Sequence, residues 1–69
     1  MHFIDVESYF NSDRRYYIRV ENISSFYSGY DNNTIIKTID GATYNVKEDI
    51  TASIATLIKN SKIGMVYSF

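Results

Sequence analysis

Cysteine is absent from this sequence of 69 residues, and other features that mark large protein classes are missing or rare. Without cysteine, disulfide bonds and thiolate metal sites are excluded. Glycine occurs only at positions 29, 41 and 64, which excludes a glycine-rich phosphate-binding loop. No apolar run reaches the roughly 18 residues that a membrane-spanning helix requires. What remains is a small domain, for which we expect no membrane partner.

Neither sign of charge is in clear excess. Seven Lys and Arg residues stand against eight Asp and Glu residues, a formal net charge of -1. Proteins that coat duplex nucleic acid carry a basic excess, so we expect no duplex nucleic-acid partner. The first residues, Met1-His2-Phe3-Ile4-Asp5, lack the basic region of a signal peptide. We therefore expect a cytoplasmic location.

Groups suited to catalysis or metal binding are also scarce. The one histidine, His2, has no nucleophile near it in sequence, and we expect it on the surface. A serine nucleophile would need a base and an orienting acid, and no such set is evident. Asp31-Asn32-Asn33 is too short for a calcium loop and is interpreted as a turn. These features predict a protein that is not an enzyme and holds no metal or other cofactor.

The small size of the chain itself favours self-association. A domain of this length buries little surface, and disulfides are not available to it. The hydrophobic fraction of 45% is nevertheless too high for a disordered chain. We expect one domain, residues 1–69, that forms a homo-oligomer.

The hydrophobic periodicity predicts an α+β fold, an antiparallel meander of four or five strands with one amphipathic helix near the C-terminus. Alternating segments predict strands at about 2–10, 15–21, 25–31, 34–39 and 42–47. Helical spacing of apolar residues predicts a helix at about 49–60, with Asp49 as its N-cap. Alternation returns in the tail, 62–69, which is either a last strand of the same sheet or an arm that packs on another subunit.

Two hairpin registers follow from matching the apolar faces. The first places Val6 opposite Val20, because a one-residue slip would bury Arg19. In the second, Asp40-Gly41 predicts a two-residue loop that pairs Ile35 with Val46. The core expected from these registers is Ile4, Val6, Phe10, Ile18, Val20, Ile35, Ile39, Val46, Ile50, Ile54, Leu57 and Ile58.

The strongest indication of a ligand is an arginine-tyrosine pattern. Alternation places Arg15, Tyr17 and Arg19 on one strand face, with Arg14 beside them. A guanidinium group can grip a phosphate with two hydrogen bonds, and a tyrosine ring offers a stacking surface for a base. Together they predict a site for an anionic nucleotide.

An alternative explanation of the same residues is structural. In the predicted register Glu7 lies across from Arg19, and Tyr9 across from Tyr17. A salt bridge and an aromatic cross-strand pair would then account for the pattern without a ligand.

A second aromatic segment is Phe26-Tyr27-Ser28-Gly29-Tyr30. Phe26 suits the core, but Tyr27 faces the opposite way on a strand. Tyrosine is favoured where one end of the side chain is buried and the other is wet, as in ligand pockets and interfaces. Tyr27 and Tyr30 are therefore further candidates for stacking on a base.

The C-terminal half resembles a known pattern. Residues 34–41 (Thr-Ile-Ile-Lys-Thr-Ile-Asp-Gly), 44–48 (Tyr-Asn-Val-Lys-Glu) and the apolar positions of the 49–60 helix resemble small bacterial and phage proteins of the flagellar FlbD type. The resemblance spans about residues 18–60 and implies a β-meander closed by one helix. In size, lack of catalytic groups and Arg/Tyr content the chain is also similar to phage nucleotide sponges of the anti-CBASS and anti-Thoeris type.

Two functions follow as hypotheses. In the first, a non-catalytic oligomer sequesters an anionic nucleotide signal as a phage anti-defence sponge, with sites shared between two chains. Its phosphate ligands would be Arg14, Arg15 and Arg19, and its base would stack on Tyr17, Tyr27 or Tyr30. In the second, the protein is an inhibitor or regulator of a host enzyme, anti-CRISPR-like or transcription-regulator-like, because arginine and aromatic residues also dominate protein–protein hot spots.

Overall fold

The computed structural model describes residues 2–59 and 65–69 and confirms the α+β fold class with a single helix. Its elements in chain order are β1 (His2–Glu7), β2 (Arg15–Arg19), the 3-10 turn η1 (Val20–Asn22), β3 (Ile23–Ser28), β4 (Thr34–Thr38), β5 (Thr43–Val46), α1 (Thr51–Lys59) and β6 (Met65–Ser68). Within the described ranges, no helix is long and apolar enough to cross a bilayer.

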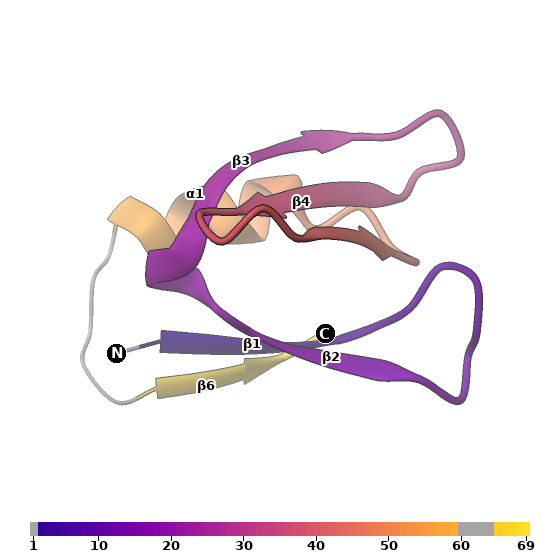
Figure 1. Cartoon of the computed structure of the whole chain (residues 1–69), viewed down its shortest axis with the longest axis horizontal. Helices are drawn as coiled ribbons and strands as arrows, with labels where there is room; N and C mark the ends of the chain where they lie inside the picture. The colour runs from indigo at the N-terminus through magenta and orange to yellow at the C-terminus, as the bar shows by residue number, and fades with distance from the viewer. Residues whose placement is uncertain (1, 60–64) are drawn as a thin grey trace.

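The strands form two three-stranded sheets, with β1 at the centre of one and β4 at the centre of the other. Figure 1 shows these sheets as two layers, with α1 behind the ribbon of β4. The layers join where β1 ends, because Ser8 forms an antiparallel bridge with Val46. On either side of the bridge, the Tyr9 N–H donates to the Asn45 carbonyl and the Lys47 N–H donates to the Glu7 carbonyl. These contacts hold the two sheets together where β1 ends and β5 ends.

The core is a single apolar cluster to which both sheets, η1 and α1 contribute. Its largest fully buried side chains are Ile4, Ile36 and Ile54, one from each sheet and one from the helix. The whole cluster consists of Ile4, Val6, Ile18, Val20, Ile36, Val46, Ile50, Ile54 and Leu57. Burial of this cluster is the main source of stability in so small a domain.

The predicted β1–β2 register is wrong by four residues. Val6 lies opposite Tyr16 rather than the predicted Val20, Ile4 lies opposite Ile18, and Phe3 lies opposite Arg19. β2 ends at Arg19, where η1 begins, and the Ser8 N–H donates to the Arg14 carbonyl at 2.9 Å while Ser8 also bridges to Val46 of β5. Because the shift is an even number of residues, the side chains within β1 and β2 keep their predicted faces.

The predicted β4–β5 register is wrong by one residue, and here the faces change. Ile36, not Ile35, lies on the buried face, and it pairs with Tyr44. The loop has three residues rather than two: the Gly41 N–H donates to the Thr38 carbonyl, and Gly41 adopts a positive φ of 89°. This is a hairpin loop in which a glycine in left-handed conformation forms a bulge.

Four residues expected in the core lie outside it. Ile39 is 70% exposed and Ile35 is half-buried, both because of the one-residue register change. Phe10 is 79% exposed, because the strand that should have buried it ends at Glu7. Ile58 is half exposed at the edge of the helix stripe.

The helix and the tail follow the sequence expectations with smaller changes. The helix begins at Thr51, and the Asp49 carboxylate accepts its N–H at 3.1 Å, so Asp49 caps from one position further out than an N-cap. The expected helix end at residue 60 and the start of the tail at 62–64 lie outside the described residues. Residues 65–68 form β6, parallel to β1 of the same chain, which agrees with the first of the two alternatives.

Candidate ligand-binding sites

The three residues of the arginine-tyrosine pattern share one exposed face of β2, as their alternation predicts. Arg15, Tyr17 and Arg19 are exposed, whereas Ile18 between them is buried. They do not act as one unit, however, because each arginine has a different environment.

Arg15 serves the fold. Its Nε donates to Asp5 Oδ1 at 2.8 Å, and its Nη2 donates to the carbonyls of Asp5 and Phe69 at 3.1 and 3.0 Å. The guanidinium group therefore ties β2 to β1 and to the end of β6. The structural alternative paired Glu7 with Arg19, and that pair is not formed. The arginine with a cross-strand ion pair is Arg15, with Asp5, and Glu7 pairs with Lys47 at 3.0 Å. Arg14 lies exposed in the loop before β2.

Arg19 lines a cavity of about 280 Å³ between the two sheets, which we call the Arg19 cavity. Its lining consists of Phe3, Tyr17, Ile18, Arg19, Asn22, Thr38, Asp40 and Tyr44. The Arg19 side chain is 43% exposed, and its Nε forms an ion pair with Glu21 Oε1 at 3.6 Å, beyond hydrogen-bond distance. Most of its donors therefore remain available to a ligand.

Aromatic side chains line the same cavity as Arg19. Phe3 and Tyr17 stack across β1 and β2, with ring centroids 5.2 Å apart and an interplanar angle of 18°. Tyr44 comes from β5, and its ring meets Tyr16 edge-on at 5.0 Å. The contact between Tyr16 and Tyr44 links the two sheets, so Tyr44 is held at the cavity by packing.

One carboxylate, Asp40, shares the lining with Arg19. Its pKa is lowered by a hydrogen bond from the Thr38 hydroxyl and by another from the Ala42 N–H. These bonds belong to the β4–β5 turn, so the ionised carboxylate has a structural role there. The lining carries one positive and one negative group and is close to neutral.

Tyr27 and Tyr30 lie at a different place. With Tyr9 they line a larger cavity, of about 470 Å³, which we call the tyrosine cavity. The rest of its lining consists of Ser28, Gly29, Asp31, Asn33, Ile35 and Asn45. Tyr27 is half exposed and Tyr30 fully exposed at the rim. The six predicted site residues are therefore not brought together.

The floor of the tyrosine cavity is an ordered polar cluster. Asn33 is buried; its Nδ2 donates to Asn45 Oδ1 at 2.6 Å, and its Oδ1 accepts the Asp31 N–H at 3.2 Å. A Cβ on residue 29 would lie 2.1 Å from Asn33 Oδ1, so only glycine lets the chain pass this amide. The Tyr9 hydroxyl donates to the Asp31 carboxylate, and this bond raises the Tyr9 pKa.

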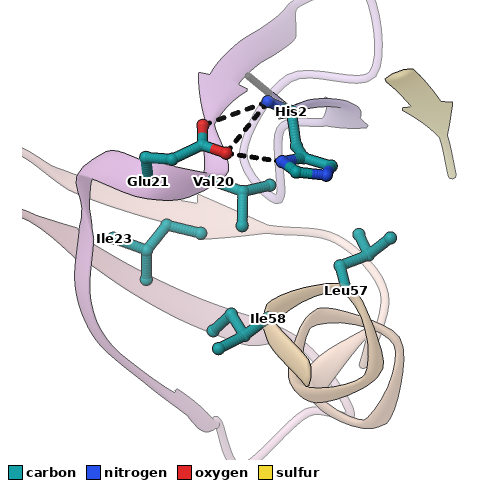
Figure 2. A pocket seen from close by; sticks show the side chains of 6 residues that line it. All are labelled: His2, Val20, Glu21, Ile23, Leu57 and Ile58. Carbon is teal, nitrogen blue, oxygen red and sulfur yellow. Dashed lines mark hydrogen bonds and ion pairs between the residues drawn. The ribbon is translucent and has the colours of Figure 1, made fainter. Parts of the chain in front are cut away.

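A third cavity, of about 220 Å³, lies beside His2 and is shown in Figure 2. His2 is 2% exposed, so the expectation of a surface histidine is wrong. Both its Nδ1 and its main-chain N–H donate to the Glu21 carboxylate of η1. Leu57 and Ile58 of α1 form the opposite wall. The contacts between His2 and Glu21 hold the start of β1 against η1.

We expect the domain to lose stability in acid through Glu21. Hydrogen bonds from the His2 side chain, followed by that from the His2 main chain, lower the pKa of Glu21 from 4.5 to about 2. A depressed carboxyl pKa stabilises the fold above the unfolded pKa, and the contribution is lost as pH falls from about 4.5 to about 2. Because the carboxylate is 39% exposed, solvent screening limits the effect to about 1 kcal/mol.

Urea unfolding at a series of pH values measures this effect. Glu21→Gln should flatten the acid limb of the stability profile in that window. The lowered pKa values of Asp40 and Asp49 act in the same direction and persist in the variant, so some acid dependence remains. An unchanged acid limb in Glu21→Gln would contradict the assignment.

Several residues of the Arg19 cavity and of the tyrosine cavity were not predicted as site residues. Phe3 lines the Arg19 cavity because the observed β1–β2 register places it opposite Arg19, and Tyr44 does so because it comes from the other sheet; no local pattern signals either. Tyr9 and Asp31 are brought together by a hydrogen bond between residues that are 22 positions apart. Within residues 2–59 and 65–69, no group of three or more His, Asp and Glu side chains lies together as a metal site would require.

Comparison with known proteins adds no relative. No family model, no curated protein sequence and no solved structure matches the chain. The functional argument therefore rests on the chemistry of the cavities.

Proposed function

We propose that this chain is a non-catalytic binding protein that sequesters a small anionic nucleotide, and that the Arg19 cavity is its site. The observation that carries the proposal is a guanidinium group with available donors in a cavity that Phe3, Tyr17 and Tyr44 also line. A nucleotide combines a phosphate with a flat base, so it needs both kinds of group.

Different groups in the lining would bind different parts of the nucleotide. Arg19 would bind the phosphate, and the exposed ring of Tyr17 or Tyr44 would stack on the base. The Asn22 amide and the Asp40 carboxylate offer a donor and an acceptor for the edge of the base or a ribose hydroxyl. Arg15 and Arg14 of the original hypothesis are left out of the phosphate site.

The size of the cavity favours a site completed by a second chain. Small-molecule pockets commonly enclose about 300–1,000 Å³, and the Arg19 cavity has about 280 Å³. One cation also neutralises little of a phosphate's charge. A homo-oligomer that brings two Arg19 cavities together would supply a second guanidinium. A phage anti-defence sponge, which lowers the concentration of a nucleotide signal, is the biological role we propose for it.

Calorimetric titration of the purified protein with cyclic AMP, cyclic dinucleotides and linear nucleotides tests the proposal. We expect heat with at least one of them and a loss of about 10- to 100-fold in affinity in Arg19→Ala, since hydrogen bonds to charged groups contribute about 1.5–3 kcal/mol. Arg14→Ala, in the exposed loop before β2, is the matched control and should bind normally. No heat with any nucleotide, or equal loss in both variants, would overturn the proposal.

An inhibitor or regulator of a host enzyme is the second candidate function. The observation in its favour is the large apolar side chains at the surface, chiefly Phe10 and Ile39. Phe10 lies in the β1–β2 loop and Ile39 in the β4–β5 loop, and aromatic and apolar side chains exposed in this way are suited to protein contacts. Absorbance at the wavelength of nucleobases in the purified protein would indicate a bound nucleotide and support the sponge. A pull-down from host lysate that recovers one host protein in stoichiometric amount, and fails to do so with Phe10→Ala, would support the inhibitor.

A further inference from the structure

The tyrosine cavity differs from the Arg19 cavity in its charge. Three aromatic rings, from Tyr9, Tyr27 and Tyr30, line it, and Asp31 is the one charged residue among the nine that form its wall. Neither lysine nor arginine is among them. A phosphate placed here would meet a carboxylate with no compensating cation, so the stacking role first assigned to Tyr27 and Tyr30 does not suit an anion.

Aromatic rings and a carboxylate together attract cations. The face of a tyrosine ring carries the negative part of its quadrupole, and an ammonium group within about 6 Å of the ring centre is attracted to it. The ionised Asp31 adds a direct Coulomb attraction. The same carboxylate raises the pKa of Tyr9, first through the hydrogen bond that the Tyr9 hydroxyl donates to Asp31 and then through the negative charge of Asp31.

The ordered floor gives this cavity a defined shape. Asn33 and Asn45 are hydrogen-bonded to each other, and the Tyr9 hydroxyl is held by Asp31. The close approach of Gly29 to Asn33 fixes the loop that carries Tyr30. A ligand would therefore order few groups when it binds, chiefly the rim ring of Tyr30.

We propose that the tyrosine cavity binds an organic cation of the methylated ammonium class. A quaternary ammonium group is large, weakly hydrated and without donors, so it suits a wall of ring faces better than a wall of hydrogen-bond acceptors. The chemistry is shared by a free ligand such as choline and by a trimethylated lysine side chain on a partner protein. This site is separate from the Arg19 cavity and does not depend on nucleotide binding.

Titration of the isotope-labelled full chain, followed by two-dimensional NMR, is the test. Tetramethylammonium and choline are the cationic probes, and dimethylbutanol, in which carbon replaces the nitrogen of choline, is the neutral one. At constant ionic strength we expect saturable shifts of the amides around Tyr27–Asn33 and Asn45 with the cations and at least about tenfold weaker binding of the neutral probe. Equal binding of choline and dimethylbutanol would overturn the proposal, because apolar volume alone would explain it.

Two variants place the cation within the cavity. Tyr30→Ala removes a fully exposed ring, and Asp31→Asn removes a charge but keeps an acceptor for the Tyr9 hydroxyl, so both should fold. Each should weaken choline binding several-fold, while Arg19→Ala, in the other cavity, should leave it unchanged. Normal choline binding in both variants would overturn the proposal. If a trimethyllysine peptide binds at least tenfold tighter than choline, the natural source of the cation is a protein. If choline binds at least tenfold tighter than the peptide, the natural source is a free metabolite.

Discussion

Replacing Ile36 with alanine is expected to lower the free energy of unfolding by about 2–5 kcal/mol, as for other fully buried aliphatic residues. The Ile36 side chain is 0% exposed in the middle of β4 and belongs to the core shared by both sheets and α1. Total stability for a chain of 69 residues is about 3–10 kcal/mol. The substitution should therefore remove a large fraction of the total stability, and urea titration monitored by circular dichroism should show a much lower unfolding midpoint.

The matched control is Ile39→Ala, three positions along the same segment. Ile39 is 70% exposed, and exposed substitutions usually change stability by less than about 0.5 kcal/mol. The register that a two-residue loop would impose predicts the opposite ranking, with Ile39 buried. A larger loss of stability in Ile39→Ala than in Ile36→Ala would contradict the observed β4–β5 register.

Thr34→Val is expected to destabilise the fold by about 2–6 kcal/mol although it keeps the shape of the side chain. The Thr34 hydroxyl is fully buried; it donates to the Glu48 carbonyl at 2.7 Å and accepts the Ile50 N–H at 2.8 Å. Valine would leave both main-chain groups without a partner, at about 1–3 kcal/mol each. The hydroxyl thus joins β4 to the segment that leads into α1.

Two controls separate this role from packing and from general threonine replacement. Thr34→Ser retains the hydroxyl and loses one methyl group, so it should cost about 1 kcal/mol. Thr56→Val removes an exposed hydroxyl that donates to the Ala52 carbonyl within α1, and its effect should be less than about 0.5 kcal/mol. Equal unfolding midpoints for Thr34→Val and Thr34→Ser would contradict the bridging role.

The sequence predicts the fold class because periodicity survives changes of register. β1 and β2 keep their buried faces after a four-residue shift, since side chains alternate with a period of two. The β4–β5 hairpin shows where the approach fails. Asp40-Gly41 is compatible with a two-residue loop and with the observed three-residue loop, and the choice between them exchanges Ile35 for Ile36 in the core. Thr34 and Thr38 are buried in the observed register. The Glu48 carbonyl accepts a hydrogen bond from the Thr34 hydroxyl, and the Asp40 carboxylate of the β4–β5 turn accepts one from the Thr38 hydroxyl.

The candidate sites were predictable only in part. A shared exposed face for Arg15, Tyr17 and Arg19 follows from alternation alone. The different surroundings of the two arginines do not follow from alternation. Arg15 donates hydrogen bonds to Asp5 and to the carbonyl of Phe69, which lies 54 positions further along the chain. Surplus tyrosine was apparent from composition, but only the meeting of Tyr9 with the β3–β4 loop reveals that three of these rings share a cavity with a carboxylate.

Mapping nucleotide binding residue by residue tests the central claim most directly. The isotope-labelled full chain would be titrated with the nucleotide that gives the strongest calorimetric signal, and amide shifts followed by two-dimensional NMR. The account predicts saturable shifts at Tyr17, Arg19, Asn22 and Tyr44, with none of comparable size at Tyr27 or Tyr30. Shifts centred on the tyrosine cavity, or no saturable shifts at millimolar nucleotide, would contradict it.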